Sequence, residues 1–571
     1  MITTKKGQSG KPRINLSTKV GIGEFARTLP TLSPQDYALY RASEVRAEGG
    51  DNNGLRGAAR FPGQPSAWEL LADPVAASAF LEGQDPFTIL EEDYGITNFT
   101  GTNWLDAITQ NTLRQFYDLD FSGSTDNGTS YYASVGVADE QGTIINSGFT
   151  RYSGRLNLDQ KLGSAITAAL KLQYSRSEYV GLIGDNRADN AIAQSNFLNP
   201  FISRDNVTGN REGILNNGGS GVGPESPEYR INNLDVFRGS DWFSSNLSLA
   251  IQPTEWLEIA VTGGLITENF ARSYFAPSLL RESRNVNGRL DNTNSRDSRW
   301  IFQPRVAINK NWDSGHSFSG TLVFEARKET FNQTFTRYEQ FNTEVLGNYS
   351  LAAAQNIFST PTFIDRRELS YLGRIQYGYA GKYILTVSTR IDQSSRFIND
   401  NTGIFPAVSG AWNVSEENFL KGSNLISTLK LRGGYGITGN NQIPVNSGLQ
   451  LANIPNVSYP FNDGLNTAVD PSSRFANSDI TWETTKGTNV GIDVGFLKDR
   501  FTLSTNYYVN TTTGLLLDVQ LPAYSAFANS IQNLGSLENR GLEFEILSRN
   551  FTRSNFNWTT TFNISFNRNK I

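Results

Sequence analysis

The sequence predicts an all-β chain that forms a transmembrane antiparallel β-barrel, and three observations carry this prediction. Apolar and polar residues alternate with a period of two in many segments, as in β-strands whose two faces meet different surroundings. Short turns and long polar connections follow one another along the chain, which is typical of barrels with short periplasmic turns and long extracellular loops. No stretch of about 18 apolar residues offers a transmembrane helix.

The composition excludes several classes of function. The 571 residues include no cysteine and a single histidine, His316, so disulfide scaffolds, thiolate metal sites and multi-histidine centres are excluded. A net charge of −5 argues against a general nucleic-acid-binding protein. The mean hydropathy of −0.39 is compatible with barrel strands, because these alternate. A secreted β-rich binding protein, such as an adhesin or a lectin, is the alternative reading of the same pattern.

The segment 151–177, RYSGRLNLDQKLGSAITAALKLQYSRS, illustrates the expected hairpin. Two alternating runs flank a break at residues 161–164. Leu170 stands on the apolar parity and Lys171 on the polar one. We expect the apolar parity to face lipid and the polar parity to face the barrel interior.

The same pattern repeats and predicts roughly 17 strands between residues 12 and 567, many of them about 9–11 residues long. Short turns are expected at residues 160–164, 253–255, 313–315, 380–382 and 497–500. Long external loops are expected at residues 177–241, 271–298, 328–367, 438–481 and 513–536.

Aromatic residues are expected near strand ends, where they would form interfacial girdles. They are Tyr117, Tyr174, Trp242, Trp256, Phe270, Trp412, Tyr507 and Trp558. A short external helix is predicted after Ser33, a good N-cap that is followed by Pro34.

Several motifs are better explained without chemistry. The Gly434-x-Gly436-x-x-Gly439 pattern lacks a following helix, so we interpret it as a strand that enters a loop rather than as a nucleotide site. The Asp- and Asn-rich segment 291–299 lacks the glycine and the bidentate glutamate of a calcium-binding loop. Glu416 and Glu417 are expected in a solvated turn, and His316 beside one.

Six stretches in order resemble the SusC/RagA family of TonB-linked outer-membrane transporters. One of them is ITWETTKGTNVGIDVGFLKDRFTLSTNYY (480–508). The others cover residues 131–162, 371–397, 405–420, 429–444 and 533–546. The resemblance implies a barrel of about 22 strands, of which about 17 would be present here. It also implies an internal plug and import driven by TonB.

The resemblance further predicts how the chain is divided. Residues 1–11 would be the end of the plug and its linker, and residues 12–571 would be the barrel domain. On this interpretation the chain is a fragment. Most of the plug would be missing upstream and about five strands downstream. This interpretation agrees with physics, because about 17 strands that do not close would leave two unpaired edges in lipid.

The resemblance implies a transporter rather than an enzyme. The cargo would be an oligosaccharide or a peptide, and no cofactor or metal is expected. The expected partners are the TonB complex, a SusD-like surface lipoprotein and outer-membrane lipids, with no nucleic acid. Exposed aromatics often mark binding surfaces, so contact residues for cargo or lipoprotein are proposed in two loops. They are Tyr459, Phe461, Tyr524 and Phe527, for which packing between loops is the alternative role.

Overall fold

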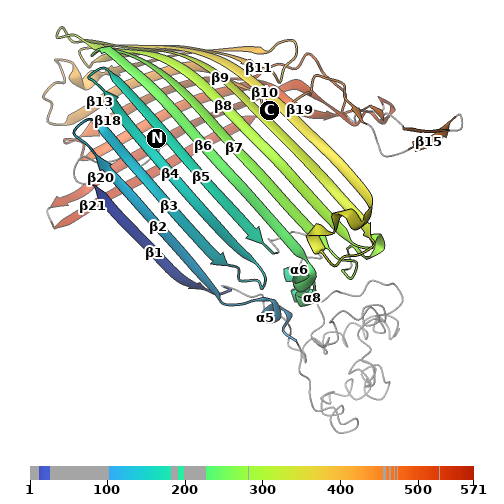
Figure 1. The fold of residues 1–571 in the computed structure, drawn as a ribbon. Coiled ribbons are helices and arrows are strands. Elements are labelled where there is room, and N and C mark those ends of the chain that lie inside the picture. Colours follow the sequence, from blue (N-terminus) through green and yellow to red (C-terminus); the bar gives the residue numbers. More distant parts are fainter. Residues whose placement is uncertain are drawn as a thin grey trace, which may run out of the picture.

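The structure, a computed structural model, is dominated by one 17-stranded antiparallel sheet (Figure 1). The fold class predicted from the sequence is confirmed in this respect. The described residues are 12–25, 32, 102–181, 191–197, 227–280, 282–453, 458–461, 464–467, 470–471, 474–525, 527–553 and 555–571. The helix predicted after Ser33 and the predicted plug segment 1–11 lie outside them, so both stay predictions.

The strands of the main sheet follow one another in chain order, each antiparallel to the next, with β18 pairing directly with β13. They are β1 (Arg13–Gly23), β2 (Thr112–Ser124), β3 (Thr129–Gln141), β4 (Gly148–Leu162), β5 (Ile166–Val180), β6 (Asp235–Thr254), β7 (Leu257–Ala276), β8 (Arg289–Asn311), β9 (His316–Phe341), β10 (Ala354–Tyr379), β11 (Tyr383–Ser394), β12 (Thr402–Asn413), β13 (Ile426–Asn440), β18 (Glu483–Phe496), β19 (Phe501–Gln520), β20 (Asn529–Arg553) and β21 (Phe556–Lys570).

The remaining elements are short. Within the connection between β13 and β18, β14 (Ala452–Asn453) pairs with β17 (Asp470–Pro471), and β15 (Ser458–Phe461) pairs with β16 (Gly464–Thr467). The described helices are α5 (Trp104–Ile108), α6 (Ala191–Phe197), α8 (Pro227–Asn233), η2 (Arg284–Val286), η3 (Gly347–Ala353), η4 (Val414–Glu416) and η5 (Ala523–Ser525). None of the helices in the described ranges is long and apolar enough to cross a membrane.

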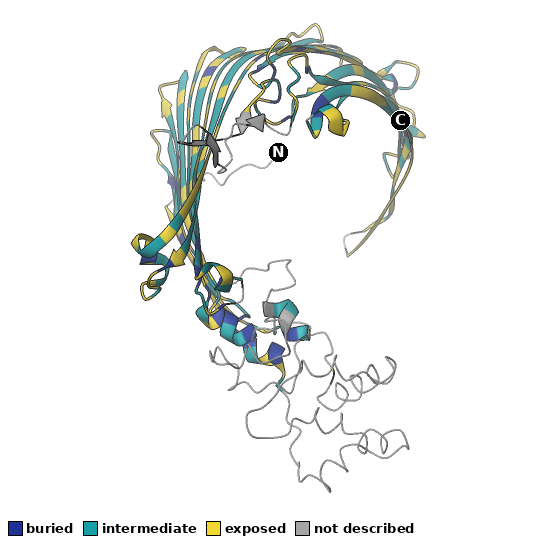
Figure 2. Ribbon diagram, turned by 90° about the vertical axis from the view of Figure 1, so that its right-hand side faces the viewer, coloured by how far each residue is buried: buried dark blue, intermediate teal, exposed yellow. Residues whose placement is uncertain are grey.

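Seen end on, the sheet curves into an open trough (Figure 2). Among the described residues, β1 pairs only with β2, and β21 pairs only with β20. The helices α5, α6 and α8 gather at one end of the strands, beside the trough (Figure 1). Leu105, Ile108 and Ile231 form a small core there, where Asn103 caps α5 by accepting from the backbone N–H of Leu105.

One end of the sheet carries tight turns, as predicted. Residues 163–165, 255–256, 312–315, 380–382 and 497–500 connect consecutive strands there. The turn between β10 and β11 has positive φ at both Ala380 and Gly381, the geometry that suits the twist of a two-stranded hairpin. We call this the short-turn end, and the opposite end the long-loop end.

A carboxylate anchors the short-turn end. Glu417 accepts hydrogen bonds from Lys382 Nζ at 2.8 Å, from the Tyr383 hydroxyl at 2.6 Å and from Trp412 Nε1 at 3.2 Å. These three donors, Lys382 first, lower the pKa of Glu417 to about 2. Tyr383 and Trp412 thus direct polar atoms to the rim of the sheet while their rings lie along it, which is the position expected for interfacial aromatics.

The predicted long loops were partly wrong, because three of them are mostly strand and a fourth, 177–241, begins and ends in strand. Of residues 271–298, only 277–288 connect β7 to β8, and of residues 328–367, only 342–353 connect β9 to β10. Of residues 513–536, only 521–528 connect β19 to β20. The connection between β13 and β18, residues 441–482, agrees with the prediction.

The predicted strand length of 9–11 residues was also wrong for β6 to β10, which contain 20 to 26 residues. The physical reason is that the outer halves of these strands carry polar residues on both faces, with apolar residues such as Phe331 and Phe363 scattered among them. A segment such as 328–341 therefore shows no alternation between apolar and polar residues, although its backbone pairs fully with β8 and β10.

The curvature of the sheet distinguishes its two faces. Along β11, Tyr383, Leu385 and Val387 are exposed, whereas the residues between them are half-buried. Side chains crowd together on the concave face of a curved sheet and spread apart on its convex face. The apolar parity therefore forms the convex face and the polar parity the concave face. Leu170 lies on the apolar parity, opposite Leu158 and Leu247. Lys171 lies on the polar parity, opposite Asn157 and Asn246.

The convex face carries an apolar band that ends abruptly. Its side chains in β8, β9 and β10 are apolar or glycine within residues 300–308, 318–326 and 369–377. Each range matches the roughly 9–11 residues that a tilted strand needs to cross a bilayer. Beyond this band, toward the long-loop end, the same face becomes mainly polar in β8 and β9, whereas β10 still exposes Ile357 and Phe363. The predicted aromatic girdle fails at Trp242 and Phe270, which lie inside β6 and β7 on the concave parity.

Candidate functional site: the concave wall

The concave face between β11 and β21 contains a hollow of about 960 Å³. Consecutive strands place small or hydrogen-bonding side chains around it, because each strand presents every second residue to this face. The polar lining residues on the concave parity are Thr386, Ser388, Ser409, Thr438, Thr485, Asn489, Tyr508, Asn510, Asn539, Glu543 and Asn567. Amide and hydroxyl groups of this kind can both donate and accept hydrogen bonds.

Glycines on the concave face deepen this hollow. A Cβ atom at Gly487 would lie 2.8 Å from Asn510 Oδ1, and one at Gly541 would lie 2.6 Å from the Tyr508 hydroxyl. Gly541 stands between Tyr508 and Asn567 in the strand register. Because this glycine has no side chain, the Tyr508 hydroxyl reaches across it to Asn567 Oδ1 at 3.3 Å.

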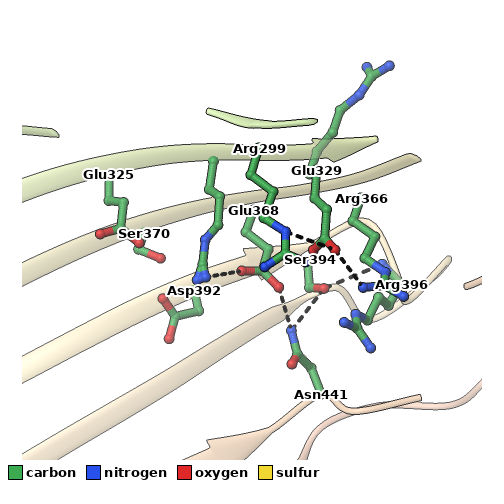
Figure 3. Close-up of polar contacts among 12 residues, drawn as sticks. Arg299, Glu325, Glu329, Arg366, Glu368, Ser370, Asp392, Ser394, Arg396 and Asn441 are labelled. Atoms are coloured by element: carbon green, nitrogen blue, oxygen red, sulfur yellow. Dashed lines mark hydrogen bonds and ion pairs between the residues drawn. The ribbon is translucent and has the colours of Figure 1, made fainter. Parts of the chain in front are cut away.

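A ladder of charged residues covers the concave face of β8 to β11 (Figure 3). Glu329 of β9 pairs with Arg299 at 3.5 Å and with Arg366 at 3.2 Å, from the two neighbouring strands. One step toward the short-turn end, Arg327 lies 3.7 Å from Glu368. Opposite charges placed across neighbouring strands stabilise a sheet locally, typically by about 0.2–1 kcal/mol per pair.

The ladder also holds the connection between β13 and β18. Asn441 Nδ2 donates to Glu368 Oε1 at 3.2 Å and to Ser394 Oγ at 3.1 Å (Figure 3). Arg396 Nη1 donates to the carbonyl oxygen of Ile443 at 2.7 Å. Ile443 packs in a small core with Phe397, Ile480 and Ile531, so the connection lies against the concave wall at the long-loop end.

A second charged cluster stiffens the strand extensions between β8 and β9. Asp291 accepts from Arg337 Nε at 2.8 Å and from Arg289 Nε at 3.0 Å. Burial raises the pKa of the Asp291 carboxyl, but the hydrogen bonds from Arg289 and Arg337 outweigh it and hold the pKa below its ordinary value. These residues lie beyond the apolar band, so the extensions are ordered by ion pairs as well as by the backbone ladder.

The four contact residues predicted from the sequence fall into two loops. Tyr459 and Phe461 belong to β15, where their register partners are Asn466 and Gly464. Tyr524 lies in η5 with 91% of its surface exposed. Phe527 packs edge-on against Phe475, with ring centroids 5.0 Å apart, which agrees with the alternative role of packing between loops.

The amide-lined hollow was not predicted. Its signal was present in the sequence, because the residues between the apolar ones in β18 and β19 include Asn489, Asn506 and Asn510. Strand alternation alone does not say which strands become neighbours around a hollow, and this depends on the register between strands.

The motifs that were interpreted without chemistry lie in strands or at a turn, although Glu417, expected to be solvated, is held by three hydrogen bonds. The glycines of the 434–439 pattern lie in β13, and residues 291–299 lie in β8. His316 begins β9, with its Nδ1 2.5 Å from the Tyr377 hydroxyl. Across the described ranges, no group of three or more His, Asp or Glu side chains could hold a metal ion.

An antiparallel sheet with an apolar convex face and a polar concave face is the arrangement of a transmembrane β-barrel wall. Residues 35–570 match the family model described as TonB dependent receptor-like, beta-barrel, and the chain belongs to this family. This confirms the family resemblance that was inferred from the sequence.

Several curated relatives match the whole chain, among them two from different bacteria. One is the TonB-dependent receptor P3 of Formosa agariphila, 29% identical over 579 residues, with 52% of its own length covered. The other is the TonB-dependent receptor SusC of Bacteroides thetaiotaomicron, 25% identical over 623 residues, with 54% covered. The chain thus spans about half the length of these relatives.

Solved structures share the fold. A structure of the RagAB peptide transporter aligns with 99% of this chain and 62% of its own, at a TM-score of 0.73 and 21% identity. RagAB in its open-open state aligns with the same share of this chain at a TM-score of 0.74 and 22% identity.

Proposed function

We propose that the chain forms the wall of an outer-membrane transporter that imports a large nutrient with energy from the TonB complex. The observation that carries the proposal is the pairing of a convex apolar band of bilayer length with a concave polar wall, in a member of the TonB-dependent receptor family. The protein would be a multi-pass barrel of a Gram-negative outer membrane. It acts as a transporter and not as an enzyme.

The proposed cargo is an oligosaccharide. The hollow on the concave wall offers amide and hydroxyl groups, the partners that sugar hydroxyls require, and Tyr508 adds an aromatic ring. A peptide is the second candidate, because the solved structure with the same fold is named a peptide transporter. Backbone amides of a peptide can use the same asparagine side chains.

The long-loop end is the proposed extracellular face. A SusD-like lipoprotein would cover it, and the TonB complex would act through a plug joined near residues 1–11. Tyr459, Phe461, Tyr524 and Phe527 are the proposed contact residues for the cargo or the lipoprotein. Alanine at all four positions should weaken uptake or lipoprotein capture without lowering surface abundance, whereas loss of abundance alone would favour a packing role.

Sidedness can be tested with single cysteines, because residues 1–571 contain none of their own. Single cysteines at Tyr524, at the long-loop end, and at Lys421, at the short-turn end, are introduced into the intact transporter. An impermeant thiol reagent should label Y524C on whole cells and K421C only after lysis. The reverse pattern would contradict the proposed orientation.

Uptake measurements test which class of cargo the transporter carries. Cells that carry the intact transporter are compared with cells lacking it, and with cells lacking TonB, for accumulation of fluorescent oligosaccharides and of fluorescent peptides. N510L/N539L in the hollow should reduce uptake of the oligosaccharide, whereas V509L, which points to the convex face beside it, should not. Uptake that survives the loss of TonB would overturn the proposal.

A further inference from the structure

Two basic residues face each other at the edge of the apolar band. Lys328 of β9 and Arg367 of β10 are direct partners in the strand register, one step beyond the last apolar pair, Ala326 and Leu369. Their parity is that of exposed Leu322 and Leu369, so both side chains lie on the convex face. Trp300 of β8 is the partner of Lys328 on its other side.

This arrangement is unfavourable for the sheet by itself, because like charges directly opposite each other on neighbouring strands repel. One carboxylate, Asp365, offsets them: Lys328 Nζ lies 3.0 Å and Arg367 Nε 2.9 Å from it. Thr330, which is neutral, is the register partner of Asp365. Two cations share one anion, which leaves a net positive charge, and 68% of the Arg367 side chain is exposed.

A similar basic pair lies in β20 and β21, where Lys570 is a further cation opposite the nearby carboxylate Glu538. Arg540 of β20 and Arg568 of β21 are direct partners, one step beyond the apolar pair Leu542 and Phe566. Glu538 lies 4.0 Å from Arg540 and takes the place that Asp365 has in the first pair, two residues further toward the long-loop end. Both basic pairs therefore sit at the same boundary between apolar and polar surface.

The charge of a basic residue on the convex face can also be fully balanced by carboxylates, as at Arg176. It also lies on the convex parity, in β5, but Glu178 is 2.7 Å away and Asp241 4.0 Å away. Two carboxylates therefore surround one cation there. The excess positive charge at the two basic pairs is thus a local feature and not a property of the whole rim.

We propose that the pairs Lys328–Arg367 and Arg540–Arg568 bind the phosphate of anionic lipid headgroups in the membrane leaflet at the long-loop end. This inference rests on the proposed function, which places the convex face in a bilayer. Phosphate oxygens lie just outside the hydrocarbon region, and they accept charge-assisted hydrogen bonds from ammonium and guanidinium groups. Trp300, in the same row, belongs to the interfacial level where tryptophan is enriched.

The test uses the intact transporter in neutral detergent, titrated with phosphatidic acid and followed by native mass spectrometry. K328Q/R367Q and R540Q/R568Q each remove two charges and keep a polar side chain at each position. Since each basic residue near a membrane surface contributes about 1 kcal/mol, each double variant should bind phosphatidic acid roughly 5- to 30-fold more weakly at one site. K171Q/K430Q is the matched control, because it removes two separate cations from the concave face.

Three results would overturn the proposal: unchanged binding in both double variants, equal loss in the control, or equal occupancy by phosphatidylcholine. Inorganic phosphate is a further arm, and if it competes at the same concentration as the lipid, the site takes a free anion instead. Tryptophan quenching by brominated lipids in phosphatidylcholine vesicles reports separately whether the convex face meets acyl chains. Quenching without a preference for phosphatidic acid would refute this inference alone, whereas absence of quenching would refute the proposed function.

Discussion

The two halves of the long strands differ in what stabilises them. Near the short-turn end, β8, β9 and β10 alternate between an apolar convex face and a polar concave face, as in residues 318–326. Toward the long-loop end the same strands carry polar residues on both faces, as in residues 328–341. The backbone ladder continues without interruption between the halves. The strands thus continue beyond the apolar band, and only their side chains differ between the two halves.

The two halves should respond differently to the same substitution, which gives the largest expected effect. Leu322 lies at the middle of the apolar band with 64% of its surface exposed, and Asn332 lies on the same face of the same strand beyond the band. L322R should destabilise folding into a bilayer by about 2–4 kcal/mol, as arginine does at the midplane, and N332R by about 0–1 kcal/mol. Urea-dependent folding of the intact transporter into vesicles measures both, and equal losses would remove the distinction between the halves.

The two faces can be compared in the same way within one hairpin. Leu170 lies in the apolar row between Leu158 and Leu247, and Lys171 lies in the polar row between Asn157 and Asn246. L170R should cost up to about 2–4 kcal/mol, whereas K171L should cost much less because it faces no lipid. The same folding assay applies. If K171L were as harmful as L170R, the assignment of the two parities to lipid and interior would be wrong.

How much could be predicted from the sequence follows from this difference between the halves. The band was predictable because a period of two is visible wherever lipid and water lie on opposite faces, as at Leu170 and Lys171. The extensions of β9 and β10 were mistaken for loops because nothing in residues 328–341 distinguishes one face from the other. The hollow around Asn510 and Asn539 depends on register between strands, which alternation within one strand does not determine.

A smaller effect is expected in the extensions, where ion pairs rather than lipid stabilise the strands. D291N would leave Arg289 and Arg337 without their shared carboxylate and should destabilise this region locally by about 1–3 kcal/mol. Hydrogen exchange of the β8 and β9 amides beyond the band measures the opening. D313N, in the exposed turn between β8 and β9, is the control and should leave those amides unchanged.

The pH dependence of that region has a definite sign. The folded-state pKa of Asp291 is lower than its ordinary value of about 3.9. Its stabilising effect is therefore fully present above that ordinary value and is lost as the pH falls through the lower folded-state pKa. Hydrogen exchange in the extensions should speed up in this acidic range in the natural protein. D291N should show no such step, and an unchanged step would assign the acid sensitivity to another group.

The smallest effects separate two aromatic residues of one loop, at the far end of the extensions. Phe527 packs on Phe475, and F527A should lose about 0.5–1.5 kcal/mol of aromatic contact, which loosens the loop. Tyr524 is almost fully exposed, so Y524A should leave thermal stability unchanged and reduce uptake or lipoprotein capture if its ring contacts a partner. Surface abundance, thermal unfolding and uptake are measured for both variants. Uptake that falls only in F527A, together with its stability, would assign this loop a packing role and remove Tyr524 from the proposed contact surface.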